Sequence, residues 1–132
     1  MATRTQARES VIGLLYAFDM GNTDAHKGAD EIFEDKKIRN KQKEFAQELF
    51  DGVITNLEII DEKIKEKLNA RGLDDVGMVE KAILRLATYE LLYKDLDEPI
   101  IINEAIELAK RLTSDNSPKF INGVLDHIRG TK

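Results

Sequence analysis

The residues that could carry out chemistry are few in this sequence and lie far apart along it. The chain has no cysteine, which excludes a disulfide framework, a zinc finger, an iron–sulfur cluster and a thiol nucleophile. Neither histidine, His26 or His127, has a second residue at metal-ligand spacing. The carboxylates are spread over predicted helix surfaces, and the glycines form no phosphate-binding loop. We therefore predict no metal site, no cofactor and no enzyme activity.

The charged residues favour a more selective kind of binding. The net charge is −5, from 20 basic and 25 acidic residues, which argues against indiscriminate binding of nucleic acid. Basic residues nevertheless gather at three places: the first eight residues, the run 36–43 (KKIRNKQK), and the segment 110–132. An acidic protein with such patches binds RNA only where the patches converge in space. We interpret the run 36–43 as a solvated helix face rather than an RNA track.

Apolar residues recur with the period of α-helices along the whole chain, and no alternating stretch predicts a strand. We predict helices over about 3–20, 31–35, 40–70, 76–94 and 99–112, with a last helix from Ser117 onward. The fold class is therefore all-α, with six to seven helices. Gly72 divides the chain into halves of about 1–72 and 73–132. We expect these halves to form two small helical bundles packed together as a single domain, 1–132.

Several features predict where these helices begin and end. The segment 40–70, as one straight helix, would span about 45 Å, and Gly72 is a candidate C′ residue for it. Asp74 or Asp75 is placed to cap the next helix. Ser117 is a candidate N-cap for the last helix, with Pro118 in its first position. No apolar run is long enough to span a bilayer and residues 1–20 lack a signal-peptide core, so we expect a soluble, cytoplasmic protein.

Four segments resemble the conserved blocks of the NusB (N-utilization substance B) family of transcription antitermination factors. They are TRTQARESVIGLLYAFD (3–19), VEKAILRLATYELLY (79–93), EPIIINEAIELAKRL (98–112) and SPKFINGVLDHI (117–128). The resemblance covers nearly the whole chain and is strongest over 79–128. It implies an all-α fold of two three- or four-helix bundles that serves as an RNA-binding adaptor.

The resemblance also implies partners. Members of the family pair with NusE, a protein of the small ribosomal subunit, and the pair binds the boxA element of nascent RNA. Together with other Nus factors on RNA polymerase, they suppress termination, notably in ribosomal RNA operons. Some relatives form homodimers that hide the RNA surface. The alternative function for this chain is therefore a helical interaction module, or homodimer, without a direct role in RNA binding.

Arg4 and Arg8 match arginines of the family's basic opening. We interpret both as exposed first-turn residues that contact phosphates, which position RNA without reading its sequence. Basic side chains gain nothing from the dipole at a helix N-terminus, which favours a functional reason for their placement. Thr5 and Gln6 stand where relatives often carry further arginines, so the patch is weaker here.

Asn116, Lys119 and Phe120 match the family's second RNA-binding segment. At 100° per residue, Phe120 falls at the edge of the buried stripe of the last helix. An edge aromatic beside a lysine can stack on an unpaired base while the lysine meets a phosphate. The alternative interpretation is that the Phe120 ring only covers the edge of the core and has no binding role. The amide of Asn116 can hydrogen-bond a base or a phosphate.

Tyr16 and Glu80 match positions that the family places against the ribosomal-protein partner. Tyr16 lies off the main apolar face of the first helix, as an interface aromatic would. Glu80 precedes a largely apolar helix and could pair with a cation of the partner. A half-buried tyrosine and a surface glutamate without a binding role remain the alternative.

Overall fold

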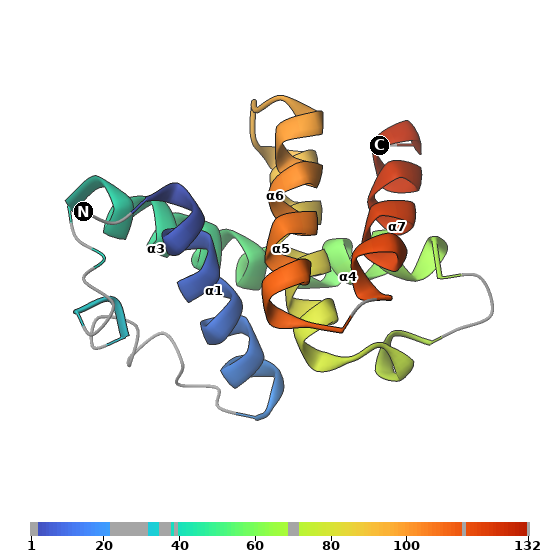
Figure 1. The fold of residues 1–132 in the computed structure, drawn as a ribbon, viewed down its shortest axis with the longest axis horizontal. Helices are drawn as coiled ribbons and strands as arrows, with labels where there is room; N and C mark the ends of the chain where they lie inside the picture. The colour runs from blue at the N-terminus through green and yellow to red at the C-terminus, as the bar shows by residue number, and fades with distance from the viewer. Residues whose placement is uncertain are drawn as a thin grey trace.

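The computed structural model describes residues 3–21, 32–34, 38, 40–68, 72–114 and 116–131. Their regular elements are all helices, which confirms the all-α prediction (Figure 1). The helices are α1 (Arg4–Asp19), α3 (Asn40–Thr55), α4 (Leu57–Glu66), the 3-10 helix η2 (Leu73–Asp75), α5 (Met78–Tyr93), α6 (Glu98–Leu112) and α7 (Ser117–Thr131). Residues 32–34 are also helical, while the rest of the predicted helix over 31–35 lies outside the described residues.

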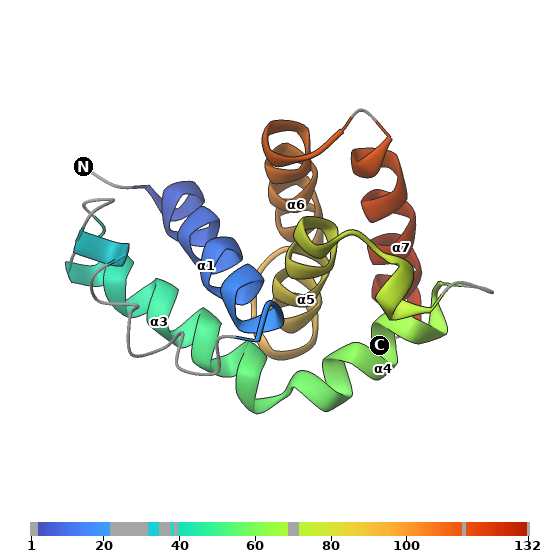
Figure 2. The same ribbon diagram turned by 90° about the horizontal axis from the view of Figure 1, so that it is seen from below.

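Helix α5 is the centre of the fold. It packs against α1 and α3 on one side and against α6 and α7 on the other, and it also contacts α4 (Figures 1 and 2). All residues from 81 to 91 are buried, as the apolar circumference of this segment predicts. The apolar side chains of these helices meet in one continuous core. The second half of the chain thus supplies the helix on which both halves pack.

The predicted single helix over 40–70 is wrong, because the chain bends at Asn56 (Figure 2). Asn56 leaves helical geometry, with φ −109° and ψ 18°. Its side-chain amide donates a hydrogen bond of 2.8 Å to the carbonyl of Gly52, and such local bonds compete with the helical ladder. The bend lets α4 pack against both α5 and α7.

The predicted helix boundaries near Gly72 are also wrong. Gly72 has an extended backbone, φ −83° and ψ 158°, and lies before η2 rather than closing a helix. The carboxylate of Asp75 accepts a hydrogen bond of 3.2 Å from the Gly72 amide, so it does not cap α5. The residue before α5 is Gly77, which has no side-chain cap.

Charged side chains on α5 are buried in ion pairs that the periodicity did not predict. The Arg85 guanidinium donates two hydrogen bonds of 2.9 Å to Asp61 of α4 and lies 3.4 Å from Asp19 of α1. Lys81 lies 3.1 Å from the same Asp19. These pairs hold the end of α1 and the middle of α4 against α5, because a buried charge left without its partner is costly.

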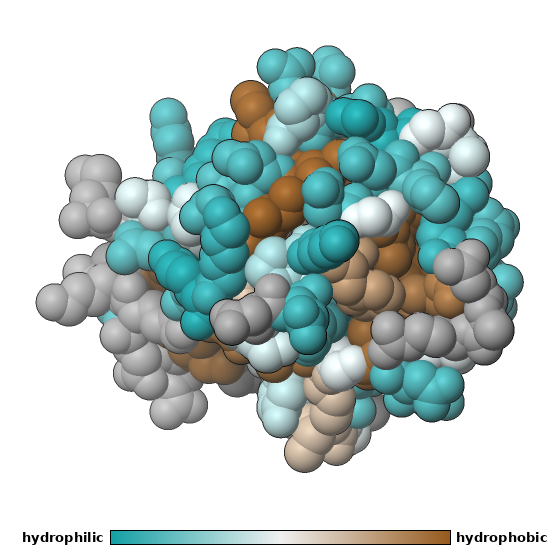
Figure 3. Space-filling model, turned by 45° about the vertical axis from the view of Figure 1, so that its right-hand side comes forward, coloured by the Kyte–Doolittle hydropathy of each residue, from teal (hydrophilic) through white to brown (hydrophobic). Residues whose placement is uncertain are grey.

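Hydrophilic residues cover most of the face of the molecule that Figure 3 shows. Figure 3 shows one face, on which hydrophobic side chains appear in separate areas between hydrophilic ones. No helix in the described part of the chain is both long and apolar enough to cross a bilayer. Of the basic run 36–43, Lys36, Lys37 and Arg39 lie outside the described residues, while Lys41 is exposed and Lys43 is half-buried.

Candidate nucleic-acid interface

The first turn of α1 is fixed by a capping box. The hydroxyl of Thr3 accepts a hydrogen bond of 3.1 Å from the Gln6 amide, and the Gln6 side chain accepts one of 2.8 Å from the Thr3 amide. This turn presents Arg4 at the surface, as predicted. The Arg4 guanidinium carbon lies 4.7 Å from the centre of the Phe45 ring of α3, a distance typical of a cation–π contact.

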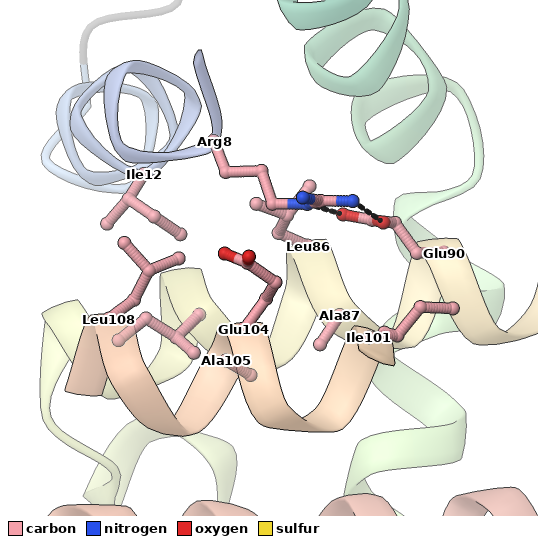
Figure 4. Close-up of a pocket in the computed structure, with 10 residues that line it drawn as sticks. Arg8, Ile12, Leu86, Ala87, Glu90, Ile101, Glu104, Ala105 and Leu108 are labelled. Carbon is pink, nitrogen blue, oxygen red and sulfur yellow. Dashed lines mark hydrogen bonds and ion pairs between the residues drawn. The ribbon is translucent and has the colours of Figure 1, made fainter. Parts of the chain in front are cut away.

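Arg8 is not the exposed residue that we predicted. It is 5% exposed, and its Nε and Nη2 atoms each donate a hydrogen bond of 2.8 Å to the carboxylate of Glu90 on α5 (Figure 4). Helix α1 turns this residue toward α5, where an ion pair replaces the water that it loses. Burial alone would lower the pKa of Arg8. The hydrogen bond and charge of Glu90, with a smaller effect of Glu104, raise this pKa above its ordinary value.

Thr5 and Glu104 tie the same turn of α1 to α6. The Thr5 hydroxyl lies 3.1 Å from each carboxylate oxygen of Glu104. The Glu104 side chain points into the space between Arg8 and Ile12 (Figure 4). Thr5 is therefore part of the contact between α1 and α6.

The start of α7 presents the second group of predicted residues. Asn116 and Lys119 are exposed, while Phe120 is half-buried and packs against the core. Ile121, the next residue, is completely buried. The predicted position of Phe120 at the edge of the buried stripe is thus confirmed. Ser117 is the first residue of α7, and its hydroxyl donates a hydrogen bond of 2.7 Å to Glu80.

The two groups lie apart, at helix starts on the same side of the fold. In Figure 2 the starts of α1 and α7 lie along one side of the molecule, with α6 between them. An RNA that reaches both groups must therefore pass over α6. Near the end of α6, Lys110 pairs with Glu107 on its own helix and Arg111 pairs with Glu9 of α1.

A groove beside α1 contains one of the two predicted partner-binding residues. Tyr16 is 39% exposed and Leu112 is 38% exposed. The groove is lined by Glu9, Ile12, Gly13, Tyr16, Val79 and Leu112. Glu80 is half-buried and held by Ser117, so its carboxylate takes part in an internal hydrogen bond beside the groove.

Two residues that contact the arginines at the start of α1 were not identified from the sequence. They are Phe45 and Glu90. Phe45 lies 41 positions after Arg4, and Glu90 lies 82 positions after Arg8. Neither local spacing nor helical periodicity links residues so far apart. The signal available was only that Glu90 is an acidic residue within the mostly apolar stretch 86–93 of α5. Among the described residues, no group of three or more histidines and carboxylates could hold a metal ion.

Comparisons with known proteins agree on one family. The model of the NusB family matches residues 5–129. Transcription antitermination protein NusB of Aliarcobacter butzleri is 66% identical over 128 residues, which cover 97% of this chain and 98% of that protein. The protein of the same name from a Nitratiruptor species is 62% identical over 128 residues, which cover 97% of this chain and 92% of that protein.

Solved structures show the same fold. The structure of T. maritima NusB is 37% identical, has a TM-score of 0.91, and covers 98% of this chain and 92% of its own. A crystal structure of antitermination factors NusB and NusE in complex with dsRNA is 30% identical, has a TM-score of 0.89, and covers 98% of this chain and 97% of its own. With the family model matching almost from end to end, this chain belongs to the NusB family of transcription antitermination proteins.

Proposed function

We propose that this chain is an RNA-binding adaptor that joins boxA RNA to NusE, in the cytoplasm and without catalysing a reaction. With other Nus factors on RNA polymerase, the complex suppresses termination, notably in ribosomal RNA operons. The observation that carries this proposal is the placement of two cation–aromatic groups on one side of the fold, at the starts of α1 and α7. The structural likeness to a NusB–NusE complex with dsRNA supports it.

Each exposed residue has a role in this proposal. Arg4 and Lys119 contact phosphates, which gives affinity but no sequence preference. The ring of Phe120 stacks on an unpaired base, and the amide of Asn116 hydrogen-bonds a base or phosphate. Arg8 contributes indirectly, because it is buried and two of its donors are already bonded to Glu90.

The groove beside α1 is the proposed site for NusE. Its exposed side chains Tyr16 and Leu112 line the groove together with Gly13, beside which there is open space for a partner side chain to approach the helix closely. Aromatic residues of this kind are enriched at interfaces. Glu80 supports the rim of this site through its bond to Ser117.

The test is a titration of boxA RNA into the chain, with and without NusE. We expect weak binding by the chain alone and markedly tighter binding with NusE, because the basic surface is small on a chain of net charge −5. Affinity should fall steeply with salt, since phosphate contacts release counterions. An affinity that stays unchanged over a tenfold range of salt would show that phosphate contacts are not the main contribution.

A variant separates the partner site from the RNA site. Tyr16→Ala should weaken NusE binding and leave RNA binding by the chain alone unchanged. Tyr93→Ala is the matched control, because Tyr93 is similarly exposed, at 44%, but lies at the end of α5. Equal loss of NusE binding in both variants would remove the groove from the proposal.

The second candidate function is a homodimer that covers the same groove and has no direct role in RNA binding. The exposed Tyr16 and Leu112 favour it, because two such apolar surfaces can bury one another. Sedimentation over a range of concentrations, followed by the RNA titration, distinguishes the two. A dimer that fails to bind boxA RNA even with NusE present would support this candidate.

A further inference from the structure

The start of α1 contains a feature beyond its basic charge: two arginines share one aromatic ring from another helix. The guanidinium carbon of Arg4 lies 4.7 Å and that of Arg8 lies 5.2 Å from the centre of the Phe45 ring. Phe45 is half-buried and packs against the core, so its ring has a fixed place. Arg4 and Arg8 are one helical turn apart, which lets both side chains reach α3.

The two arginines beside that ring differ in burial and in ion pairing. Glu90 takes up two donors of Arg8 and neutralises its charge in a buried pair whose side chains are 6% and 2% exposed. Arg8 therefore holds its side of the ring in place and offers little to an outside ligand. Arg4 is exposed to solvent. A cation–π contact uses the face of a guanidinium and leaves its N–H groups, which lie in the plane, available to an acceptor.

We propose that Phe45 is a positioning residue for RNA, which holds the Arg4 guanidinium in the orientation that meets a phosphate. An arginine side chain without such support has several rotatable bonds and loses their freedom when it binds. The Phe45 ring removes part of that freedom beforehand. This inference rests on the proposed RNA-binding function and adds to it a residue from α3, outside the two basic segments.

The experiment compares variants at Phe45 for binding to boxA RNA and for thermal stability. Phe45→Leu keeps an apolar side chain but removes the ring, and it should weaken RNA binding by about two- to fivefold, the range expected for an exposed cation–π contact. Phe45→Tyr keeps the ring and should bind nearly as well as the unmodified chain. Matched and scrambled RNA should be affected alike, because the contact is with a phosphate.

A double variant shows whether Phe45 acts through Arg4. In the Arg4→Ala background, Phe45→Leu should cause no further loss of RNA affinity. Phe18→Leu is the matched control, since Phe18 is also half-buried but lies near the other end of α1, and it should leave RNA affinity unchanged. Equal losses from Phe45→Leu with and without Arg4, or an equal loss from Phe18→Leu, would overturn the inference.

A readout without RNA tests the geometry itself. In NMR spectra, the side-chain protons of Arg4 should show a ring-current shift that Phe45→Leu abolishes and Phe45→Tyr retains. A chain that binds boxA RNA but lacks this shift would overturn the inference and leave the proposed function standing. A chain that shows the shift but binds no boxA RNA, with or without NusE, would overturn the proposed function and the RNA role of Phe45 with it.

Discussion

The starts of α1 and α7 offer the same kinds of side chain but assemble them differently. In α7, Lys119 and Phe120 are consecutive residues of one helix. In α1, the ring beside the arginines comes from α3, and Glu90 of α5 binds one of the two arginines. The α7 group is therefore a local feature of the sequence, whereas the α1 group exists only after three helices have packed together.

In both groups, residues that are close in sequence differ in how deeply they are buried. Arg4 and Arg8 are one helical turn apart, yet Arg4 is exposed and Arg8 is only 5% exposed. Phe120 and Ile121 are neighbours, yet one is half-buried and the other is fully buried. Substitutions at these two pairs test the comparison most directly.

The largest effect is expected at Arg8. Arg8→Ala should lower the free energy of unfolding by about 3–5 kcal/mol, because it leaves the buried carboxylate of Glu90 without its partner. Urea denaturation followed by circular dichroism measures this change. Replacing both residues together, as Arg8→Met with Glu90→Leu, should recover most of the loss, since no uncompensated charge then remains.

The control for Arg8 is an arginine in an exposed pair. Arg111 pairs with Glu9, and the two side chains are 51% and 32% exposed. Arg111→Ala should therefore cost no more than about 1 kcal/mol. If Arg8→Ala unfolds at the same urea concentration as Arg111→Ala, the Arg8–Glu90 pair is not the buried contact that the structure shows.

The next effect distinguishes the neighbours at the start of α7. Ile121→Ala should lower the free energy of unfolding by about 2–5 kcal/mol, because it opens a cavity in the core. Phe120→Ala should cost less stability than the roughly 3–5 kcal/mol of a fully buried phenylalanine. It should instead weaken RNA binding by about 1–3 kcal/mol through the lost stacking.

Thermal melts and RNA titrations on both variants check this prediction. If Phe120→Ala melts as early as Ile121→Ala while its folded fraction binds RNA normally, the ring belongs to the core and the stacking role is wrong. The α7 group would then consist of Lys119 and Asn116 alone.

The sequence predicted what depends on local pattern and missed what depends on contacts between helices. Periodicity located α1, α6 and α7 closely. It could not place the bend at Asn56, because the bend follows from one amide turning back to the carbonyl of Gly52. It assigned Arg8 to the surface, because the partner that buries it lies 82 positions away.

A smaller effect is expected at Lys119. Lys119→Ala should weaken binding of matched and scrambled RNA alike and should reduce the slope of log affinity against log salt by about 0.7, the value of one phosphate contact on single-stranded RNA. Titrations at several salt concentrations measure the slope. Lys65→Ala, at an exposed lysine of α4, should leave the slope unchanged. A loss confined to matched RNA would mean that Lys119 contacts a base.

The smallest effect on folding is expected at Arg4, and it completes the contrast with Arg8. Arg4→Ala removes an exposed cation–π contact worth about 0.5–1 kcal/mol. It also removes a positive charge from the N-terminus of α1, where the helix dipole disfavours cations by about 0.3–1 kcal/mol. Alanine is, in addition, a slightly better helix former than arginine.

These contributions oppose one another, so Arg4→Ala should change the free energy of unfolding by no more than about 0.5 kcal/mol, measured by the same urea denaturation as for Arg8→Ala. Arg4→Ala should lower the free energy of RNA binding by more than it changes the free energy of unfolding. An exposed arginine that opposes the helix dipole and adds little to stability is explained by binding. A loss of stability close to that of Arg8→Ala would show instead that both arginines serve the packing of α1 on α3, and the two groups at the starts of α1 and α7 would no longer be equivalent in function.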